Sequence, residues 1–305
     1  MTQETRPGNS NQITRDYFDS LLIELRYIDS VIPSTTFELY GEKFSTPIMT
    51  AALSHLDSCH PNGMSELAKG AVAANAVMWA GMGDKAELES ITATGAKTIK
   101  IIKPYADNDM IFDKIEHAEK CGALAVGMDI DHSFNHKGRY DNVLDFQMSS
   151  KTLEEIKSFI KATKLPFVIK GVLSEQDTYK CIEAGAKGIV VSHHHGIQDF
   201  AVPPLMILPK IAKLVDSRIP IFVDCGLYSG MDAFKALALG ADAVSVGRGL
   251  MKALSDDGAS GVEKKIEEMT DELSAVMART CSKDLAGIDS SVIKTAIEGE
   301  KGTCK

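Results

Sequence analysis

The sequence predicts an α/β fold, a (β/α)8 TIM barrel with a short helical N-terminal segment and a C-terminal helix. The first supporting observation is a unit that recurs eight times along the 305 residues, in which a short apolar run is followed by a loop and an amphipathic stretch. The second is that most of these runs are continuously apolar, as expected of parallel strands buried on both faces. A doubly wound sheet is the structural alternative, and the count of eight favours the barrel.

The apolar runs define the strands and the stretches between them define the helices. In chain order the predicted strands are Pro47–Leu53, Ala76–Ala80, Thr98–Lys103, Ala123–Asp129, Pro166–Val172, Gly188–Ser192, Pro220–Asp224 and Asp242–Val246. The predicted helices are Ser65–Ala74, Lys85–Thr94, Asp109–Lys120, Leu153–Ala162, Glu175–Ala184, Pro204–Val215 and Met231–Leu239. Several end at a glycine, which readily adopts the left-handed conformation found at helix C-termini.

The segments that flank the barrel are also predicted to be ordered. Residues 1–46 are expected to form a helical segment with a short β element around Thr36–Phe44. After the last strand, Gly258–Thr280 has the pattern of one long charged amphipathic helix. No linker or change of composition divides the chain. We therefore expect a single domain over residues 1–305, with an N-terminal segment (1–46), the barrel strands (47–250) and a helical closure (251–305).

Composition excludes several classes of function. The formal net charge is −9, which argues against nonspecific binding to nucleic acid or anionic membrane but leaves room for a small anion in a local basic pocket. The six cysteines form no CxxC pair, so neither a zinc knuckle nor a dithiol motif is indicated. No apolar run approaches the roughly 18–20 residues of a membrane span, and Met1–Arg15 is polar. We expect a cytoplasmic protein.

In a barrel, functional groups gather at the carboxyl ends of the strands. Here five of the predicted strands end in polar or charged residues, which buried strands tolerate when those groups pair or serve a site. The residues concerned are Asp129 and Asp131, Lys170, Ser192 to His195, Asp224, and Arg248.

The ends of the last two strands have the features of a phosphate cradle. Gly226 and Gly230 follow one strand, and Gly247, Arg248 and Gly249 follow the other. Glycines let backbone N–H groups approach an anion closely, and an arginine adds a forked cation. The alternative is that these glycines only make turns, but barrels often bind phosphate at these two loops, which favours the cradle.

Lys170 ends the fifth predicted strand. It could form a Schiff base, pair with a carboxylate, or place positive charge beside an electron-accepting ring. A lysine that reaches solvent is the alternative, and the apolar neighbours Ile169 and Val172 argue against it.

Three consecutive histidines follow the sixth strand. Successive strand residues point to opposite faces, so His193 and His195 are expected to share one side and His194 to take the other. One histidine facing a site is then favoured over a three-ligand metal centre, and we predict no metal. Asp129 ends a strand on the same rim and could orient His194, unless it only caps a loop.

Read together, these residues resemble the FMN-dependent α-hydroxy-acid oxidases and dehydrogenases, a family that includes glycolate oxidase, lactate oxidase and mandelate dehydrogenase. The resemblance covers most of the chain and retains the order of the family's motifs. The matching segments are Asp16–Ser20, Pro47–Met49, His60–Gly63, Lys170-Gly171, Glu183–Ala186, Val191-Ser192, Phe234–Val244, Gly247-Arg248 and Asp284–Asp289.

The resemblance implies an FMN cofactor, a small organic acid as substrate, and a homo-oligomer, a tetramer in the family. It implies that His194 is the catalytic base, that Asp129 orients it, and that Tyr17 contacts the substrate carboxylate. It assigns to FMN the residues Lys170, Ser192, Asp224, Gly226, Gly247 and Arg248.

The chain also departs from the family's pattern. Ile197 stands where the family's substrate-binding Arg is expected, Lys103 replaces a second Tyr, and Tyr228 replaces an Arg of the phosphate motif. The connection between the fourth and fifth strands is short for the family, which predicts a shortened loop over the active site. Lys103 or Arg139 is the candidate to replace the missing carboxylate contact.

These observations favour an FMN-dependent oxidoreductase that oxidises a 2-hydroxy acid or a related alcohol and passes two electrons to flavin N5. One alternative retains FMN but changes the reaction, to another dehydrogenation or an isomerisation, because Ile197 replaces the Arg. A second alternative is a non-catalytic flavin- or phosphate-binding barrel.

Overall fold

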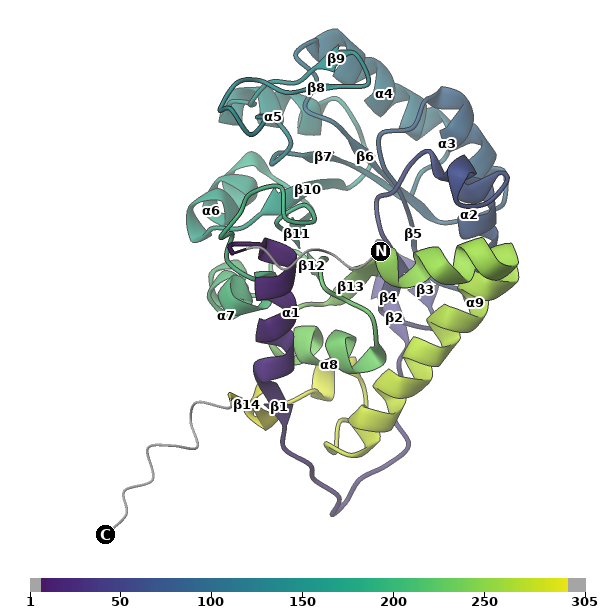
Figure 1. Ribbon diagram of the computed structural model, residues 1–305, viewed down its shortest axis with the longest axis vertical. Coiled ribbons are helices and arrows are strands. Elements are labelled where there is room, and N and C mark those ends of the chain that lie inside the picture. The colour runs from purple at the N-terminus through teal and green to yellow at the C-terminus, as the bar shows by residue number, and fades with distance from the viewer. Residues whose placement is uncertain (1–6, 296–305) are drawn as a thin grey trace.

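The computed structural model describes residues 7–295, and its centre is a parallel sheet that curves almost completely round (Figure 1). The strand order is β4-β13-β12-β11-β10-β7-β6-β5. The two outermost strands meet through a bridge between Leu53 and Ala80 and a hydrogen bond from Gly81 N to Leu53 O of 2.6 Å. The strands are β4 (Ile48–Thr50), β5 (Met78–Ala80), β6 (Thr98–Ile102), β7 (Ala125–Asp129), β10 (Phe167–Val172), β11 (Gly188–Val191), β12 (Ile221–Val223) and β13 (Ala243–Val246). The predicted (β/α)8 barrel is confirmed.

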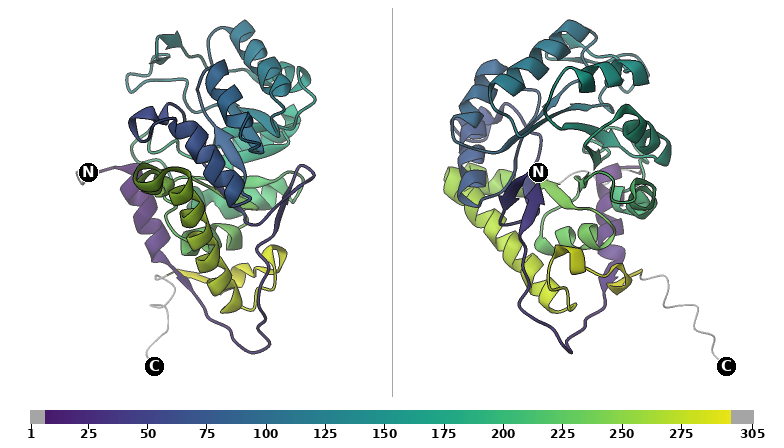
Figure 2. Two further views of the ribbon diagram at one scale, coloured as in Figure 1. Left: turned by 90° about the vertical axis from the view of Figure 1, so that its right-hand side faces the viewer. Right: turned by 180° about the vertical axis from the view of Figure 1, so that it is seen from behind.

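Helices surround this sheet on the outside (Figure 2). They are α2 (Gly63–Ala73), α3 (Lys85–Thr92), α4 (Asn108–Lys120), α5 (Leu153–Lys161), α6 (Glu175–Ala184), α7 (Pro204–Val215), α8 (Gly230–Ala238) and α9 (Arg248–Ala278). Short polar side chains cap several of their N-termini, such as Thr152 on α5 and Ser174 on α6. Element α9 consists of two helices joined at a kink, where the backbone departs from helical geometry at Asp257 and Gly258, and the second of them corresponds to the predicted helix Gly258–Thr280.

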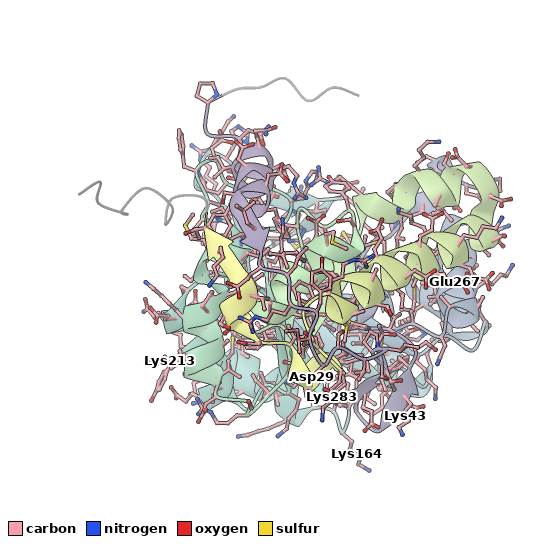
Figure 3. The ribbon with its side chains drawn as sticks, turned by 90° about the horizontal axis from the view of Figure 1, so that it is seen from below. Asp29, Lys43, Lys164, Lys213, Glu267 and Lys283 are labelled. Atoms are coloured by element: carbon pink, nitrogen blue, oxygen red, sulfur yellow. The ribbon has the colours of Figure 1, made fainter. Side chains whose placement is uncertain are left out.

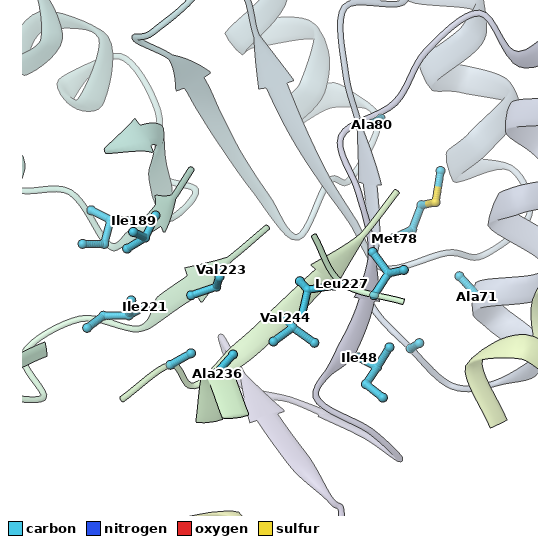
Figure 4. Packing of buried hydrophobic residues seen from close by; sticks show 14 of the residues in the cluster. Ile48, Ala71, Met78, Ala80, Ile189, Ile221, Val223, Leu227, Ala236 and Val244 are labelled. Atoms are coloured by element: carbon cyan, nitrogen blue, oxygen red, sulfur yellow. The ribbon is translucent and has the colours of Figure 1, made fainter. Parts of the chain in front are cut away.

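The strands are apolar on both faces because both faces are buried. Inside the barrel, Trp79 meets the edge of Phe222 at a ring-centroid distance of 5.4 Å. Outside it, side chains such as Ile48, Ile189 and Val244 pack in the layer between sheet and helices (Figure 4). This arrangement explains why the strands lack the alternation of a half-exposed sheet.

The N-terminal segment covers both ends of the barrel. Helix α1 (Ser10–Ser20) lies at the carboxyl ends of the strands, since its Thr14 contacts His193 beyond β11. The hairpin β2 (Phe37–Leu39)–β3 (Glu42–Phe44) lies at the amino ends, where Tyr40 Oη donates to Lys187 O, directly before β11, at 2.7 Å. The predicted helical segment with a β element is confirmed.

Two small antiparallel pairs were not predicted. β1 (Leu21–Ile23) pairs with β14 (Ile293–Thr295), and β8 (Asn142–Val143) pairs with β9 (Phe146–Gln147) in the connection after β7. Three short 3-10 turns complete the elements, η1 (Leu56–Ser58), η2 (Leu285–Gly287) and η3 (Ser290–Val292). Within residues 7–295, no helix has both the length and the apolar character needed to cross a membrane.

Charged side chains divide into two groups. Most are exposed, and Lys43, Lys164, Lys213 and Glu267 point outward from the molecule (Figure 3). By contrast six of those within residues 7–295 are buried. Lys103, Asp129, Lys170 and Asp224 stand at or just beyond the carboxyl ends of barrel strands, while Lys100 lies within β6 and Asp232 near the start of α8. The gathering of buried charged residues at the carboxyl ends of the strands indicates a functional site at this end of the barrel.

Candidate active site

A cavity of about 250 Å³ opens at the carboxyl end of the barrel. It takes its lining from the residues that follow β4, β11, β12 and β13, and from β10. Six of the residues predicted from the sequence line it: Lys170, His194, Asp224, Gly226, Gly247 and Arg248. Ser192 adjoins them, because its Oγ lies 3.4 Å from Lys170 Nζ.

Lys170 is the cation at the centre of the cavity floor. Its Nζ lies 3.2 Å from Asp224 Oδ2 and 3.5 Å from Asp129 Oδ1, and the side chain is buried. Burial alone would lower the pKa of Lys170, but Asp224 and then Asp129 outweigh it and raise this pKa well above its ordinary value. Lys170 is therefore a permanent ammonium, which disfavours a Schiff base and agrees with a charge held beside a ring.

Asp129, the last residue of β7, accepts a hydrogen bond from Lys103 Nζ at 2.8 Å. Burial opposes its charged form, yet Lys103, Lys170 and His194 together hold the pKa of this carboxyl below its ordinary value. Its other oxygen, Oδ1, is buried without a hydrogen-bond partner among residues 7–295. Asp129 thus remains ionised and bridges the two lysines.

His194 is held by Asp131, not by Asp129. Its Nδ1 lies 2.8 Å from Asp131 Oδ1 but 3.7 Å from Asp129 Oδ1. A carboxylate only accepts, so Nδ1 carries the proton and Nε2 is the free base, 3.4 Å from Lys103 Nζ. The sequence prediction of Asp129 as the orienting carboxylate is corrected by this geometry, since Asp129 faces Lys103. The Asp129-x-Asp131 spacing was the available signal.

The argument from strand alternation for the histidines does not hold, because all three lie beyond β11 and two have positive φ, 47° at His194 and 58° at His195. His193 Nδ1 accepts from Gly196 N at 2.8 Å, so its Nε2 donates to Thr14 Oγ1 at 2.7 Å. His195 Nδ1 lies 2.8 Å from Asn11 Oδ1. The two outer histidines fix the turn to α1, and only His194 faces the carboxylates.

His132 was missed by sequence reasoning. Its ring is nearly parallel to that of His194, with a centroid distance of 4.8 Å and an interplanar angle of 14°. Burial, assisted by Lys103 and His194, lowers the pKa of His132 to about 4. His132 is therefore neutral near pH 7 and limits the rotation of the His194 ring.

The opposite end of the cavity suits an anion. Arg248 is the first residue of α9, where backbone N–H groups of a helix N-terminus collect. Its Nη2 donates to Asn11 Oδ1 at 2.9 Å, and no carboxylate pairs with it in the described part of the chain. Gly226 has φ +79°, and a Cβ there would come within 2.9 Å of the Thr14 side chain. Only glycine fits this position, which keeps the backbone open towards the cavity.

Cys225 stands where the family's phosphate motif has glycine. Its φ is 70°, and its Sγ donates to Asp224 Oδ1 at 3.0 Å. Burial and the neighbouring Asp224 carboxylate raise the pKa of the Cys225 thiol to about 12. Tyr228, in place of the family's second Arg, also lines the cavity and supplies no charge.

Some of the residues predicted for the site lie outside the cavity lining. Tyr17 is partly buried on α1 and is not part of the cavity lining. Ile197 follows the histidine turn and is 39% exposed. Arg139 is exposed in a turn where its backbone N donates to Asn135 Oδ1 at 3.2 Å. Lys103 and Asp129 do not line the cavity either, but Lys103 Nζ lies within hydrogen-bond distance of both Asp129 and His194.

The histidine and carboxylates also have the geometry of a cation site, since ligand atoms of Asp129, Asp131 and His194 lie within 4.8 Å of one another. The ammonium groups of Lys103 and Lys170 already neutralise Asp129. A metal ion would therefore have to displace two lysines.

The cavity fits FMN at both ends. Lys170 offers a buried cation for a ring that gains negative charge on reduction, while Gly226, Gly247 and Arg248 offer an unpaired cation and open backbone for a phosphate. The residues that would hold the cofactor come from four neighbouring strand ends.

Comparison with known proteins agrees with this geometry. The family model described as FMN-dependent dehydrogenase matches residues 2–153 and 141–295. Glycolate oxidase 3 of Arabidopsis thaliana is 30% identical, over 96% of this chain and 88% of its own length. Glycolate oxidase of Spinacia oleracea is 29% identical, over 97% of this chain and 89% of its own.

Solved structures give the same result. A mandelate oxidase variant with 4-Br-2-hydroxy-methylphenylacetate superposes with a TM-score of 0.87 at 26% identity, covering 95% of this chain and 93% of that one. A mandelate oxidase variant with a monooxide FMN adduct has a TM-score of 0.85 at 28% identity, covering 95% and 92%. The chain therefore belongs to the FMN-dependent dehydrogenase family, as an oxidoreductase with FMN as its cofactor.

Proposed function

We propose that this protein oxidises a 2-hydroxy acid or a related alcohol, with His194 as the base that takes the hydroxyl proton. One observation carries the proposal: His194 stands at the cavity with its Nδ1 fixed by Asp131 at 2.8 Å, which leaves Nε2 free to accept a proton. The printed names of relatives, among them glycolate oxidases and mandelate oxidase, support the 2-hydroxy acid class.

Asp131 and Asp129 support the base in different ways. Asp131 holds the tautomer and the orientation of the ring through Nδ1. When Nε2 gains a proton, Asp131 and the more distant Asp129 stabilise the imidazolium by their negative charge. A histidine held in this way contributes roughly 10²–10⁴-fold to proton transfer.

Lys103 controls access to Nε2. In the structure its ammonium lies 3.4 Å from Nε2 while it donates to Asp129. A substrate hydroxyl that approaches His194 therefore enters beside Lys103, which can donate to a substrate oxygen. We propose Lys103 as the residue that positions the substrate.

Lys170 and the phosphate end serve the cofactor. Bound FMN supplies a ring that accepts two electrons at N5. Lys170 holds its ammonium against that ring's negative charge, and Ser192 and Asp224 fix the direction of Nζ. Gly226, Gly247 and Arg248 hold the phosphate.

The test is anaerobic reduction of the bound flavin, followed by loss of its visible absorbance, with lactate, glycolate, mandelate and longer 2-hydroxy compounds. Reduction by at least one of them in wild type, and its loss in His194→Gln with FMN still bound, supports the proposal. A protein that holds FMN but is reduced by none of them, although dithionite reduces it, contradicts the proposal and favours another flavin reaction or a non-catalytic role.

Two further properties are proposed from the resemblance. We expect a homo-oligomer, a tetramer as in the family, which light scattering of the purified protein tests. The cytoplasmic location stays a prediction, and one relative, from Arabidopsis thaliana, is named a peroxisomal (S)-2-hydroxyacid oxidase. Fluorescence microscopy of the tagged full chain tests it.

A further inference from the structure

The charges around His194 are unfavourable for a free carboxylate. Both nearby ammonium groups are already paired, Lys103 with Asp129 at 2.8 Å and Lys170 with Asp224 at 3.2 Å. Lys170 also reaches Asp129 at 3.5 Å. A substrate carboxylate would share Lys103 with Asp129, whose negative charge already balances that ammonium in a buried pair.

Asp131 makes the cluster anionic. Lys103 and Lys170 balance Asp129 and Asp224, which leaves the Asp131 carboxylate with only the neutral His194 ring as partner. The formal charge of these groups is therefore −1 before proton transfer, and an acidic substrate would raise it to −2. Like charges at these separations repel strongly in a water-poor site.

Neither Arg139 nor Arg248 offers an unpaired guanidinium next to His194. Ile197, where the family's Arg is expected, has no charge, and Arg139 is exposed in its turn. Arg248 donates to Asn11 and belongs to the phosphate end of the cavity. In the part of the chain that the structure describes, the cavity lining therefore contains no unpaired cation for a substrate carboxylate next to His194.

The same cluster lacks donors. Asp129 Oδ1 and Asp131 Oδ2 are buried, and neither has a hydrogen-bond partner among residues 7–295. Ionised carboxylates accept hydrogen bonds only, and buried acceptors are normally satisfied. Both oxygens lie beneath the surface, so they add negative charge next to His194 without offering a contact to a ligand.

Resting on the proposed function, we infer that the substrate is a 2-hydroxy carboxamide, whose acid group is replaced by a neutral amide. The amide adds no negative charge beside Asp131, and its carbonyl accepts from Lys103, whose Nζ lies 3.4 Å from His194 Nε2. The carbinol carbon gives its hydrogen with two electrons to the bound cofactor, its hydroxyl proton passes to Nε2 of His194, and the product is the 2-keto amide.

The first experiment compares matched pairs with the FMN-loaded protein: lactate with lactamide, and mandelate with mandelamide. Anaerobic stopped-flow reduction gives the rate constant and apparent Kd for each, and calorimetry gives the affinities of pyruvate and pyruvamide without turnover. We expect each amide to exceed its acid at least 10-fold in rate over Kd, and pyruvamide to bind more tightly than pyruvate.

The outcomes separate the two hypotheses. Faster reduction by the acids overturns the inference and leaves the proposed function standing. No reduction by any acid or amide, with FMN bound, overturns the proposed function itself. If acids are preferred and Arg139→Ala abolishes that preference, the exposed Arg139 is the carboxylate contact and the charge argument is wrong.

A gain-of-charge variant tests the cause. Ile197 is 39% exposed, so Ile197→Arg can be accommodated, with Ile197→Met as the matched uncharged control. We expect Ile197→Arg to shift the ratio of acid to amide at least 10-fold towards the acid, and Ile197→Met to leave it unchanged. An unchanged ratio in Ile197→Arg contradicts the view that missing charge at this turn sets the preference.

Discussion

The site divides into a proposed cofactor half and a proposed substrate half, which are built differently. The cofactor half places Lys170 on β10 beside Asp129 on β7, and these two residues are direct partners in the sheet register. The substrate half relies on Asp131, His132 and His194, which all lie beyond the ends of their strands. Sheet register fixes the first half, while loop geometry fixes the second.

This difference indicates that the chain retains the family's residues for the cofactor and departs from them around the substrate. In the cofactor half, each charged group at Lys170 has a partner. In the substrate half, Oδ2 of Asp131 and Nδ1 of His132 are buried without a hydrogen-bond partner among the described residues. Loops after a strand can change their residues without disturbing the barrel, so specificity varies there while cofactor binding does not.

The largest expected effect separates the histidine of the substrate half from its neighbours. His194→Gln should reduce the rate of flavin reduction roughly 10²–10⁴-fold, because the base is lost, while FMN remains bound. Stopped-flow absorbance measures it. His195→Gln is the control, since His195 contacts Asn11 rather than the carboxylates. A larger loss in His195→Gln would show that the base is assigned to the wrong residue.

The next prediction contrasts the two aspartates. Asp129→Asn should lower the free energy of unfolding by about 3–5 kcal/mol, because it leaves the buried Lys103 without a carboxylate and Lys170 with Asp224 alone. Asp131→Asn should cost less stability but slow flavin reduction, because its contact is with His194. Urea denaturation and stopped-flow reduction of both variants measure the contrast, and the reverse pattern would exchange the roles assigned to the two residues.

The third prediction concerns the cofactor half. Arg248→Ala should weaken FMN binding by about 1.5–3 kcal/mol, because a charge-assisted contact to the phosphate is lost. Titration of the apoprotein with FMN, followed by flavin fluorescence, gives the Kd. Arg218→Ala is the control, since Arg218 only donates to the carbonyls of Val215 and Leu214 at the end of α7. Equal affinity in wild type and Arg248→Ala would remove Arg248 from the phosphate site.

The smallest effect is a pH dependence of stability in the substrate half. The pKa of His132 is lowered to about 4 in the folded protein, so between its unfolded value of about 6.5 and about 4 the unfolded chain binds more protons. The contribution of His132 to the free energy of unfolding is therefore fully present above about pH 6.5 and is lost as the pH falls towards 4. The free energy of unfolding changes by at most about 1.4 kcal/mol per pH unit in this range. Urea denaturation at pH 7 and pH 5 measures the slope, which should be smaller in His132→Asn.

The barrel was predictable because its strands and helices have distinct hydrophobic patterns in the sequence. Runs such as Phe167–Val172 are apolar throughout, and the amphipathic stretches between them have helical periodicity. The pairs β1–β14 and β8–β9 were not predictable, because they lie outside the strand–helix repeat that identifies the equally short barrel strands such as β4 and β5.

The site was predictable where it depends on strand ends, and not where it depends on turns. The gathering of Lys170, Asp224, Gly226 and Arg248 follows from barrel topology. The pairing of His194 with Asp131 does not, because it requires the positive φ of 47° at His194 and the path of the chain beyond β7. A two-residue displacement of a carboxylate lies within the error of any argument from spacing alone.

The thiol of Cys225 has a consequence for the lifetime of the protein. The thiolate is the form of cysteine that oxidants attack, and a pKa of about 12 leaves almost none of it at neutral pH. Any peroxide released when oxygen reoxidises a reduced flavin would therefore meet a sulfur that reacts slowly. We therefore expect the Cys225 thiol to oxidise slowly, although it lines the cavity.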